Sequence, residues 1–88
     1  MKNNQLVLLR KKIDKVDNQL VTLLAKRMRI VNQIKKAKNK GKLPIADKKR
    51  EVQILRKAKG KAKKLGLRGN FIEKLLKLII RESKRIQK

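Results

Sequence analysis

Apolar residues recur at alternating steps of three and four along the first half of the chain. This spacing keeps one apolar stripe on one face of a helix. The stripe contains no Gly or Pro, and Arg27 is its one polar member. The sequence predicts a helix over about residues 4–38, roughly 50 Å long from the usual rise per residue. The stripe positions are Leu6, Leu9, Ile13, Val16, Leu20, Leu23, Arg27, Ile30, Ile34 and Ala37.

Turn residues separate this helix from two shorter ones. Gly41 and Pro44 predict a loop over residues 39–47, because Gly readily ends a helix and Pro cannot continue one. Asp47 suits the N-cap of a second helix over about residues 48–64. The inward stripe of that helix is Glu51, Leu55, Ala58, Ala62 and Leu65.

A glycine-containing turn at residues 65–69 leads into a third helix over about residues 70–87. Asn70 and Glu73 have the spacing of a capping box at its start. Since no segment shows a strand pattern, we expect an all-α fold with one long helix and two shorter ones, in one domain of residues 1–88. The apolar face of the third helix is Ile72, Leu75, Leu76, Ile79, Ile80 and Ile86.

The predicted first helix is longer than a compact domain of this size, whose diameter is about 25–30 Å. Part of its apolar stripe must therefore be covered by something outside its own chain. A monomer this small would also be only marginally stable, because it buries too little of its surface. We therefore expect a homodimer built on this helix.

Polar residues occupy stripe positions where a core residue is expected. Arg27 lies on the first stripe, and Lys38 lies on the same helix face roughly 16 Å further along. Glu51 begins the second stripe, while Ser83 and Gln87 extend the third. Buried charges need partners. Together these groups, mostly cations and neutral donors, predict a cavity that binds an anion.

Each of these residues also has a plain structural interpretation. Arg27 and Glu51 could form a buried ion pair, or fix the register of a helical assembly. Ser83 could bond the carbonyl four residues before it. Lys38 could be solvated, and Gln87 could fray with the C-terminus.

Arg10 cannot easily reach the same small ligand as Arg27 within one chain. It lies about 100° around the helix and roughly 25 Å away. An antiparallel partner helix that crosses near Asn18 or Gln19 would bring Arg10 of one subunit beside Arg27 of the other. This geometry predicts two composite sites per dimer.

Composition narrows the possible chemistry. The chain has no Cys and no His, which excludes disulfides, zinc knuckles and an imidazole base, and it lacks the common ligands of transition metals, so we expect no metal site. The net charge of +23 favours anionic partners: nucleic acid, an anionic membrane surface, or a small polycarboxylate or phosphate. No apolar run approaches the ~20 residues of a membrane span, and Leu6–Leu9 is too short for a signal peptide. We therefore expect a soluble, cytoplasmic protein without membrane contact.

Five ordered segments carry a resemblance to the all-helical class of chorismate mutase. The resemblance implies an isomerase of the shikimate pathway, in the biosynthesis of phenylalanine and tyrosine, that converts chorismate to prephenate without a cofactor. It also implies an intertwined homodimer with two shared active sites. We expect no fused regulatory, dehydratase or dehydrogenase domain within these 88 residues. The segments are LRKKIDKVD (9–17), LLAKR (23–27), KAK (36–38), PIADKKRE (44–51) and LIIRESKRIQ (78–87).

The resemblance implies a role for each matching residue at the two substrate carboxylates. Arg10 would enter the site from the partner subunit and bind one carboxylate, and Arg27 would bind the other. Arg50 and Ser83 would complete these contacts.

The resemblance also assigns the groups around the reacting bonds. Lys38 and Gln87 would donate hydrogen bonds to the ether oxygen from opposite sides. Glu51, with the backbone near Asp47, would hold the ring hydroxyl. The rearrangement is concerted and needs a folded substrate and fixed donors, so the absence of His and Cys is no obstacle.

Two alternatives belong to other classes of function. Isochorismate-pyruvate lyases resemble the all-helical chorismate mutases and also bind a dicarboxylate. A Glu51 that binds a hydroxyl group favours the mutase. A basic helical nucleic-acid-binding protein explains the charge but not the polar groups on the apolar stripes. The lysine excess itself could steer a dianion or reflect compositional bias, and we expect nonspecific nucleic-acid binding as a side effect.

Overall fold

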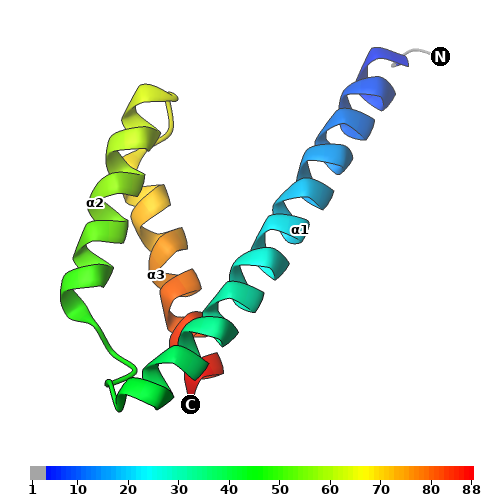
Figure 1. The fold of residues 1–88 in the computed structure, drawn as a ribbon. Coiled ribbons are helices and arrows are strands. Elements are labelled where there is room, and N and C mark those ends of the chain that lie inside the picture. The colour runs from blue at the N-terminus through cyan, green and yellow to red at the C-terminus, as the bar shows by residue number, and fades with distance from the viewer. Residues whose placement is uncertain (1–3) are drawn as a thin grey trace. The chain divides into compact units, whose positions relative to one another are not determined.

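The computed structural model describes residues 4–88, which form three α-helices and, within that range, no strand. The helices are α1 (Asn4–Gly41), α2 (Lys48–Lys64) and α3 (Gly69–Gln87) (Figure 1). The expectation of an all-α fold with one long and two shorter helices is confirmed. The chain divides into two units, the N-terminal part of α1 up to Ile30 and a second unit, Val31–Lys88. Among these helices, none combines the length and the apolar character needed to cross a bilayer.

The apolar stripe of α1 is exposed over the first unit. Ile13, Val16 and Leu20 expose 59%, 53% and 54% of their surface. Leu9 on the same stripe is exposed as well. A continuous row of large exposed apolar residues marks an interaction surface, since soluble monomers rarely leave one uncovered.

α1 ends at Gly41, three residues beyond the predicted end. Lys42 adopts the left-handed conformation, with φ at 57°. The N–H of Leu43 donates to the carbonyl of Lys38 at 2.8 Å, and the N–H of Lys42 donates to the carbonyl of Asn39 at 3.2 Å. This pair of bonds is a Schellman motif. The residue in its left-handed position is therefore a lysine, although glycine is preferred there.

α2 has the predicted bounds. The predicted N-cap is confirmed, since the Asp47 carboxylate accepts a hydrogen bond from the backbone N–H three residues on, at 3.1 Å. A second Schellman motif ends the helix, with Gly66 at a φ of 77°. The N–H of Leu67 donates to the carbonyl of Ala62 at 2.8 Å, and the N–H of Gly66 donates to that of Lys63 at 3.3 Å. Here the left-handed position is filled by the residue type that adopts it most readily.

α3 begins one residue earlier than predicted, and the capping box expected from Asn70 and Glu73 is wrong. Arg68 is the N-cap, with an extended backbone and no capping hydrogen bond from its side chain. Glu73 instead forms an ion pair with Lys59 of α2 at 2.9 Å, and a second with a lysine one turn further along α3 at 3.3 Å. Two ammonium groups hold this carboxylate away from the N-cap.

α2 and α3 pack side by side in the second unit (Figure 1). Ala62 of α2 and Ile72 and Ile80 of α3 are buried, as their stripe positions predict. Leu65 is an exception, because it lies at the C-cap of α2, where the chain leaves the helix, and it is exposed. The core of this unit also includes the buried Val31 in α1.

Candidate active site

The C-terminal turns of α3 carry two buried polar side chains. Ser83 and Gln87 continue the buried stripe of Ile80 at steps of three and four, and they expose only 7% and 9% of their surface. The Ser83 hydroxyl donates to the carbonyl of Ile79 at 2.8 Å, which is the local bond anticipated for it. Gln87 does not fray, because α3 continues through this residue. The pattern-based prediction that both side chains point inward is confirmed.

The side-chain amide of Gln87 has hydrogen-bonding capacity that the described chain does not use. One N–H of its Nε2 donates to the carbonyl of Ser83 at 3.3 Å. Its Oε1 is buried without a hydrogen-bond partner among the described residues. A buried acceptor left without a partner typically costs about 1–3 kcal/mol. Such a cost is common at sites that bind a ligand, because the ligand supplies the missing contact.

Glu51 in the first turn of α2 is half-buried and paired with Lys84 of α3. The Lys84 Nζ lies 3.3 Å from Glu51 Oε2. Since Lys84 follows Ser83 directly, the pair places Glu51 beside the last turns of α3. The sequence analysis missed Lys84. The available signal was its position one turn after the buried Ile80, on the flank of the stripe.

Lys38 is half-buried in the last turns of α1 and holds the following loop. Its Nζ donates to the carbonyl of Ile45 at 2.6 Å. The interpretation of Lys38 as a fully solvated lysine is therefore wrong. An open hollow of about 330 Å³ lies beside it and is lined by Lys38, Leu43, Pro44, Ala46, Asp47, Lys48 and Lys49. No carboxylate within residues 4–88 forms an ion pair with Lys38.

Asp47 and Arg50 contact each other through the N-cap of α2. The Asp47 side chain accepts the backbone N–H of Arg50, which positions this carboxylate at the start of the helix. The guanidinium of Arg50 is exposed and donates to Gln53 Oε1 at 3.5 Å. Its charge therefore remains available to an anion.

The two remaining predicted site residues lie in the first unit. Arg10 is exposed, and Arg27 is half-buried. The other six, namely Lys38, Asp47, Arg50, Glu51, Ser83 and Gln87, belong to the second unit. Within that unit the structure offers donors from Lys38 and Gln87 and an acceptor from Glu51. The ion pair with Lys84 places Glu51 beside the turns that carry Ser83 and Gln87, whereas Lys38 contacts the loop at Ile45.

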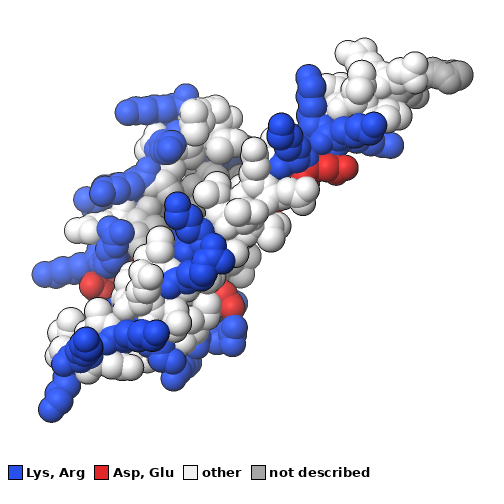
Figure 2. All heavy atoms as spheres, turned by 45° about the vertical axis from the view of Figure 1, so that its right-hand side comes forward, with Lys and Arg blue, Asp and Glu red and all other residues white. Residues whose placement is uncertain are grey.

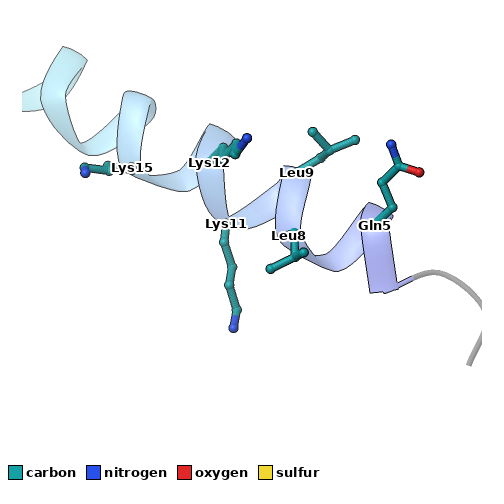
Figure 3. Close-up of a pocket in the computed structure, with 6 residues that line it drawn as sticks. All are labelled: Gln5, Leu8, Leu9, Lys11, Lys12 and Lys15. Atoms are coloured by element: carbon teal, nitrogen blue, oxygen red, sulfur yellow. The ribbon is translucent and has the colours of Figure 1, made fainter.

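A different hollow, of about 450 Å³, lies along the first turns of α1 (Figure 3). Leu8 and Lys11 extend to one side of the helix, and Leu9 extends to the other. Its walls come from a single helix, and its polar groups do not converge. We therefore assign no ligand to it. The lining residues are Gln5, Leu8, Leu9, Lys11, Lys12 and Lys15.

Basic side chains are spread over the visible surface, and far fewer acidic atoms are seen there (Figure 2). This distribution follows from 29 Lys and Arg against 6 Asp and Glu. It produces a field that attracts anions from solution. Within residues 4–88, no cluster of three or more acidic side chains is arranged to hold a metal ion.

Comparison with protein families relates the chain to enzymes. A family model described as chorismate mutase type II matches residues 9–88. The T-protein of Haemophilus influenzae is 39% identical over 75 residues, which is 85% of this chain and 20% of that protein. A bifunctional chorismate mutase/prephenate dehydratase of Buchnera aphidicola is 41% identical over 85 residues, which is 97% of this chain and 22% of that protein. The chain therefore spans about a fifth of the length of these relatives.

Two further matches cover most of both chains. A chorismate mutase of Methanocaldococcus jannaschii is 31% identical over 80 residues, which is 91% of this chain and 81% of that protein. The solved structure of a conserved hypothetical protein from Pyrococcus furiosus superposes with a TM-score of 0.79 at 40% identity. It covers 98% of this chain and 99% of that one.

Proposed function

Because this chain belongs to the chorismate mutase type II family, we propose that it converts chorismate to prephenate. The observation in the structure that best supports this activity is the buried side-chain amide of Gln87, on the turns of α3 that Glu51 adjoins, whose Nε2 has a second donor beyond the one given to the carbonyl of Ser83. The reaction is a concerted rearrangement that needs no nucleophile and no proton relay. The protein has to bind a folded substrate and stabilise charge that develops on the ether oxygen.

Lys38 and Gln87 are suited to stabilise that oxygen. An ammonium group has three donors, and the carbonyl of Ile45 uses one of those of Lys38 while fixing its direction. The Gln87 amide has two donors, of which the carbonyl of Ser83 uses one. Donors held in place before the reaction bind the transition state more tightly than the substrate, because negative charge on the oxygen grows along the path.

Glu51 is suited to hold a substrate hydroxyl. Its Oε2 is paired with Lys84, which leaves Oε1 as an acceptor beside the end of α3. We assign the substrate carboxylates to Arg27, Arg50 and Ser83, with the backbone near Asp47 completing the hydroxyl contact. These assignments follow the family resemblance at matching positions.

We propose that the active form is an intertwined homodimer with two shared sites. The exposed stripe around Ile13, Val16 and Leu20 supports this assembly, since a second copy of α1 offers a matching apolar surface. In an antiparallel arrangement that crosses near Asn18, Arg10 of the partner subunit would reach the site of Arg27. We also assign the protein to the cytoplasm, with the other enzymes of aromatic amino-acid biosynthesis.

A chorismate-consumption assay with product analysis tests the activity. We expect prephenate as the product, at a rate far above the uncatalysed rearrangement. No rate enhancement would refute the proposal, as would salicylate and pyruvate formed from isochorismate. Light scattering should give twice the chain mass of 10.3 kDa.

A further inference from the structure

The side of α2 that faces away from α3 carries two rows of cations. α2 buries Ala62 and half-buries Ile54, Leu55 and Ala58. Because a helix turns about 100° per residue, residues seven apart lie almost in line, and successive members of a row are about 10.5 Å apart. The rows are Lys49, Arg56 and Lys63, and beside them Arg50, Lys57 and Lys64. We call these six residues the basic face of α2.

The basic face has no acidic partner. All six side chains are exposed, and no carboxylate within residues 4–88 forms an ion pair with any of them. The ion-paired lysine of α2 is Lys59, which lies on the flank toward α3. By contrast, the basic residues near the start of α1 alternate with Asp14 and Asp17. Six like charges on one side of a short helix repel one another, and a bound polyanion would relieve that repulsion.

Gly60 lies within the basic face and has no packing role. A Cβ at this position would meet no atom within 4 Å. Glycine inside a helix typically costs about 1 kcal/mol relative to alanine. Here the missing side chain leaves open space between the long basic side chains, where a charged ligand can approach the helix backbone.

We propose that the basic face of α2 binds the phosphate backbone of duplex nucleic acid. The face is about 22 Å long. A duplex of that length carries about 13 phosphates on its two strands, about twice the number of cations on the face. The contact would be independent of base sequence, because lysine and arginine bound to phosphate read no base. Arg50 is also assigned to a substrate carboxylate, and it is the one residue that this proposal shares with the proposed rearrangement of chorismate. The other five cations of the basic face have no role in that reaction.

Two other polyanionic surfaces fit less well. An interfacial membrane helix needs a free apolar face, but the apolar side of α2 is packed against α3, and Val52 is the one large apolar side chain exposed along the helix. Single strands are bound largely through aromatic stacking, and the sole aromatic residue of the chain is Phe71, on α3.

Fluorescence anisotropy with a 20-base-pair DNA duplex tests the proposal, with the salt concentration varied between about 50 and 200 mM. The variant Lys57→Gln/Lys63→Gln/Lys64→Gln removes three cations of the face, and Lys11→Gln/Lys12→Gln/Lys15→Gln is the matched control on α1. Each phosphate contact adds about 0.9 to the salt slope. We expect the α2 variant to flatten the slope by roughly 2–3 and to weaken binding at least tenfold, while the control changes the slope by less than about 1.

Equal losses in the two variants would overturn the proposal, because binding would then follow total charge rather than this face. Tighter binding to phosphatidylserine vesicles than to the duplex, with the same dependence on α2, would also overturn it. Circular dichroism checks that the helices are intact. If the triple variant loses helix, Lys57→Gln/Lys64→Gln should still flatten the slope by roughly 1–2.

Discussion

Lys84 of α3 and Glu51 of α2 form an ion pair, with Nζ 3.3 Å from Oε2, next to the buried polar end of α3. Without this pair, Glu51 would be a half-buried carboxylate with no ion-pair partner among residues 4–88, and many rotamers would be open to it. The ammonium group selects one direction for it and occupies one of its two oxygens. Lys84 is therefore a positioning residue for the proposed hydroxyl contact of Glu51.

Replacing Lys84 with methionine should raise KM for chorismate and lower kcat/KM about tenfold, a loss of about 1.4 kcal/mol in transition-state binding. The free energy of unfolding should change by less than about 1 kcal/mol, since the pair is partly exposed. Lys84→Arg should restore most of the activity, and Lys74→Met on the same helix is the control. Steady-state kinetics that match the wild type in Lys84→Met would contradict this role.

Gln87→Leu should separate activity from stability. The amide is proposed to donate to the ether oxygen, and losing one such donor costs about 3–4 kcal/mol of barrier, or a hundredfold to a thousandfold in kcat. The same change removes a buried acceptor without a partner, so the free energy of unfolding should stay equal or rise. Denaturant unfolding and kinetics on Gln87→Leu measure both effects, with the exposed Gln33→Leu as control. Parallel losses of activity and stability would assign Gln87 a structural role.

Shared sites predict complementation between two inactive variants. Arg10→Ala removes a group proposed to act in the partner's site, and Lys38→Ala removes one that acts in its own. After subunit exchange in an equal mixture, half of the dimers are mixed, and each has one intact site. About a quarter of wild-type activity should therefore return. If the mixture remains inactive after exchange is demonstrated by mass, Arg10 acts within its own chain or not at all.

Glycine should be the most stable residue at the left-handed position of both Schellman motifs. Gly66→Ala should destabilise the protein by about 1 kcal/mol, because alanine is strained at a φ of 77°. The cost is conformational rather than steric, since a Cβ there meets no atom within 4 Å. Lys42→Gly should stabilise it by up to about 1 kcal/mol, because the Cβ of lysine is strained in the left-handed conformation and glycine has no Cβ. Denaturant midpoints of the two variants, measured at the same protein concentration as the wild type, show whether each change lowers or raises stability.

The ion pairs of Glu73 should make stability depend on acid pH. Hydrogen bonds from Lys59 and Lys77 hold the pKa of Glu73 below its usual value of 4.5. A lowered pKa in the folded state stabilises the fold above pH 4.5 and loses this effect as pH falls through the lowered pKa. Glu73→Gln should therefore be less stable than the wild type at neutral pH and lose less stability on acidification. Equal acid dependence in urea unfolding would show that Glu73 contributes nothing.

The helices could be predicted because an apolar period near 3.6 residues is a local property of the sequence. The same pattern placed Ser83 and Gln87 on the buried side of α3. The capping box at Asn70 could not be judged locally, since Glu73 binds a lysine from another helix. The pairing of Lys84 with Glu51 likewise depends on how two helices pack, and the contact of Lys38 with Ile45 depends on the path of the loop. Hydrogen bonds between different elements depend on tertiary packing, which the periodicity of the sequence alone does not specify.

The uncovered row of apolar residues on α1 links the proposed catalysis to mass action. In the proposed dimer, each active site includes an arginine of the partner subunit. Dilution below the dissociation constant therefore exposes the apolar row of α1 and removes that arginine from the site at the same time. Specific activity should then fall with protein concentration, and the thermal midpoint should rise with its logarithm. For this chain, the quantity of enzyme present in a cell would set its activity per molecule as well as its total amount.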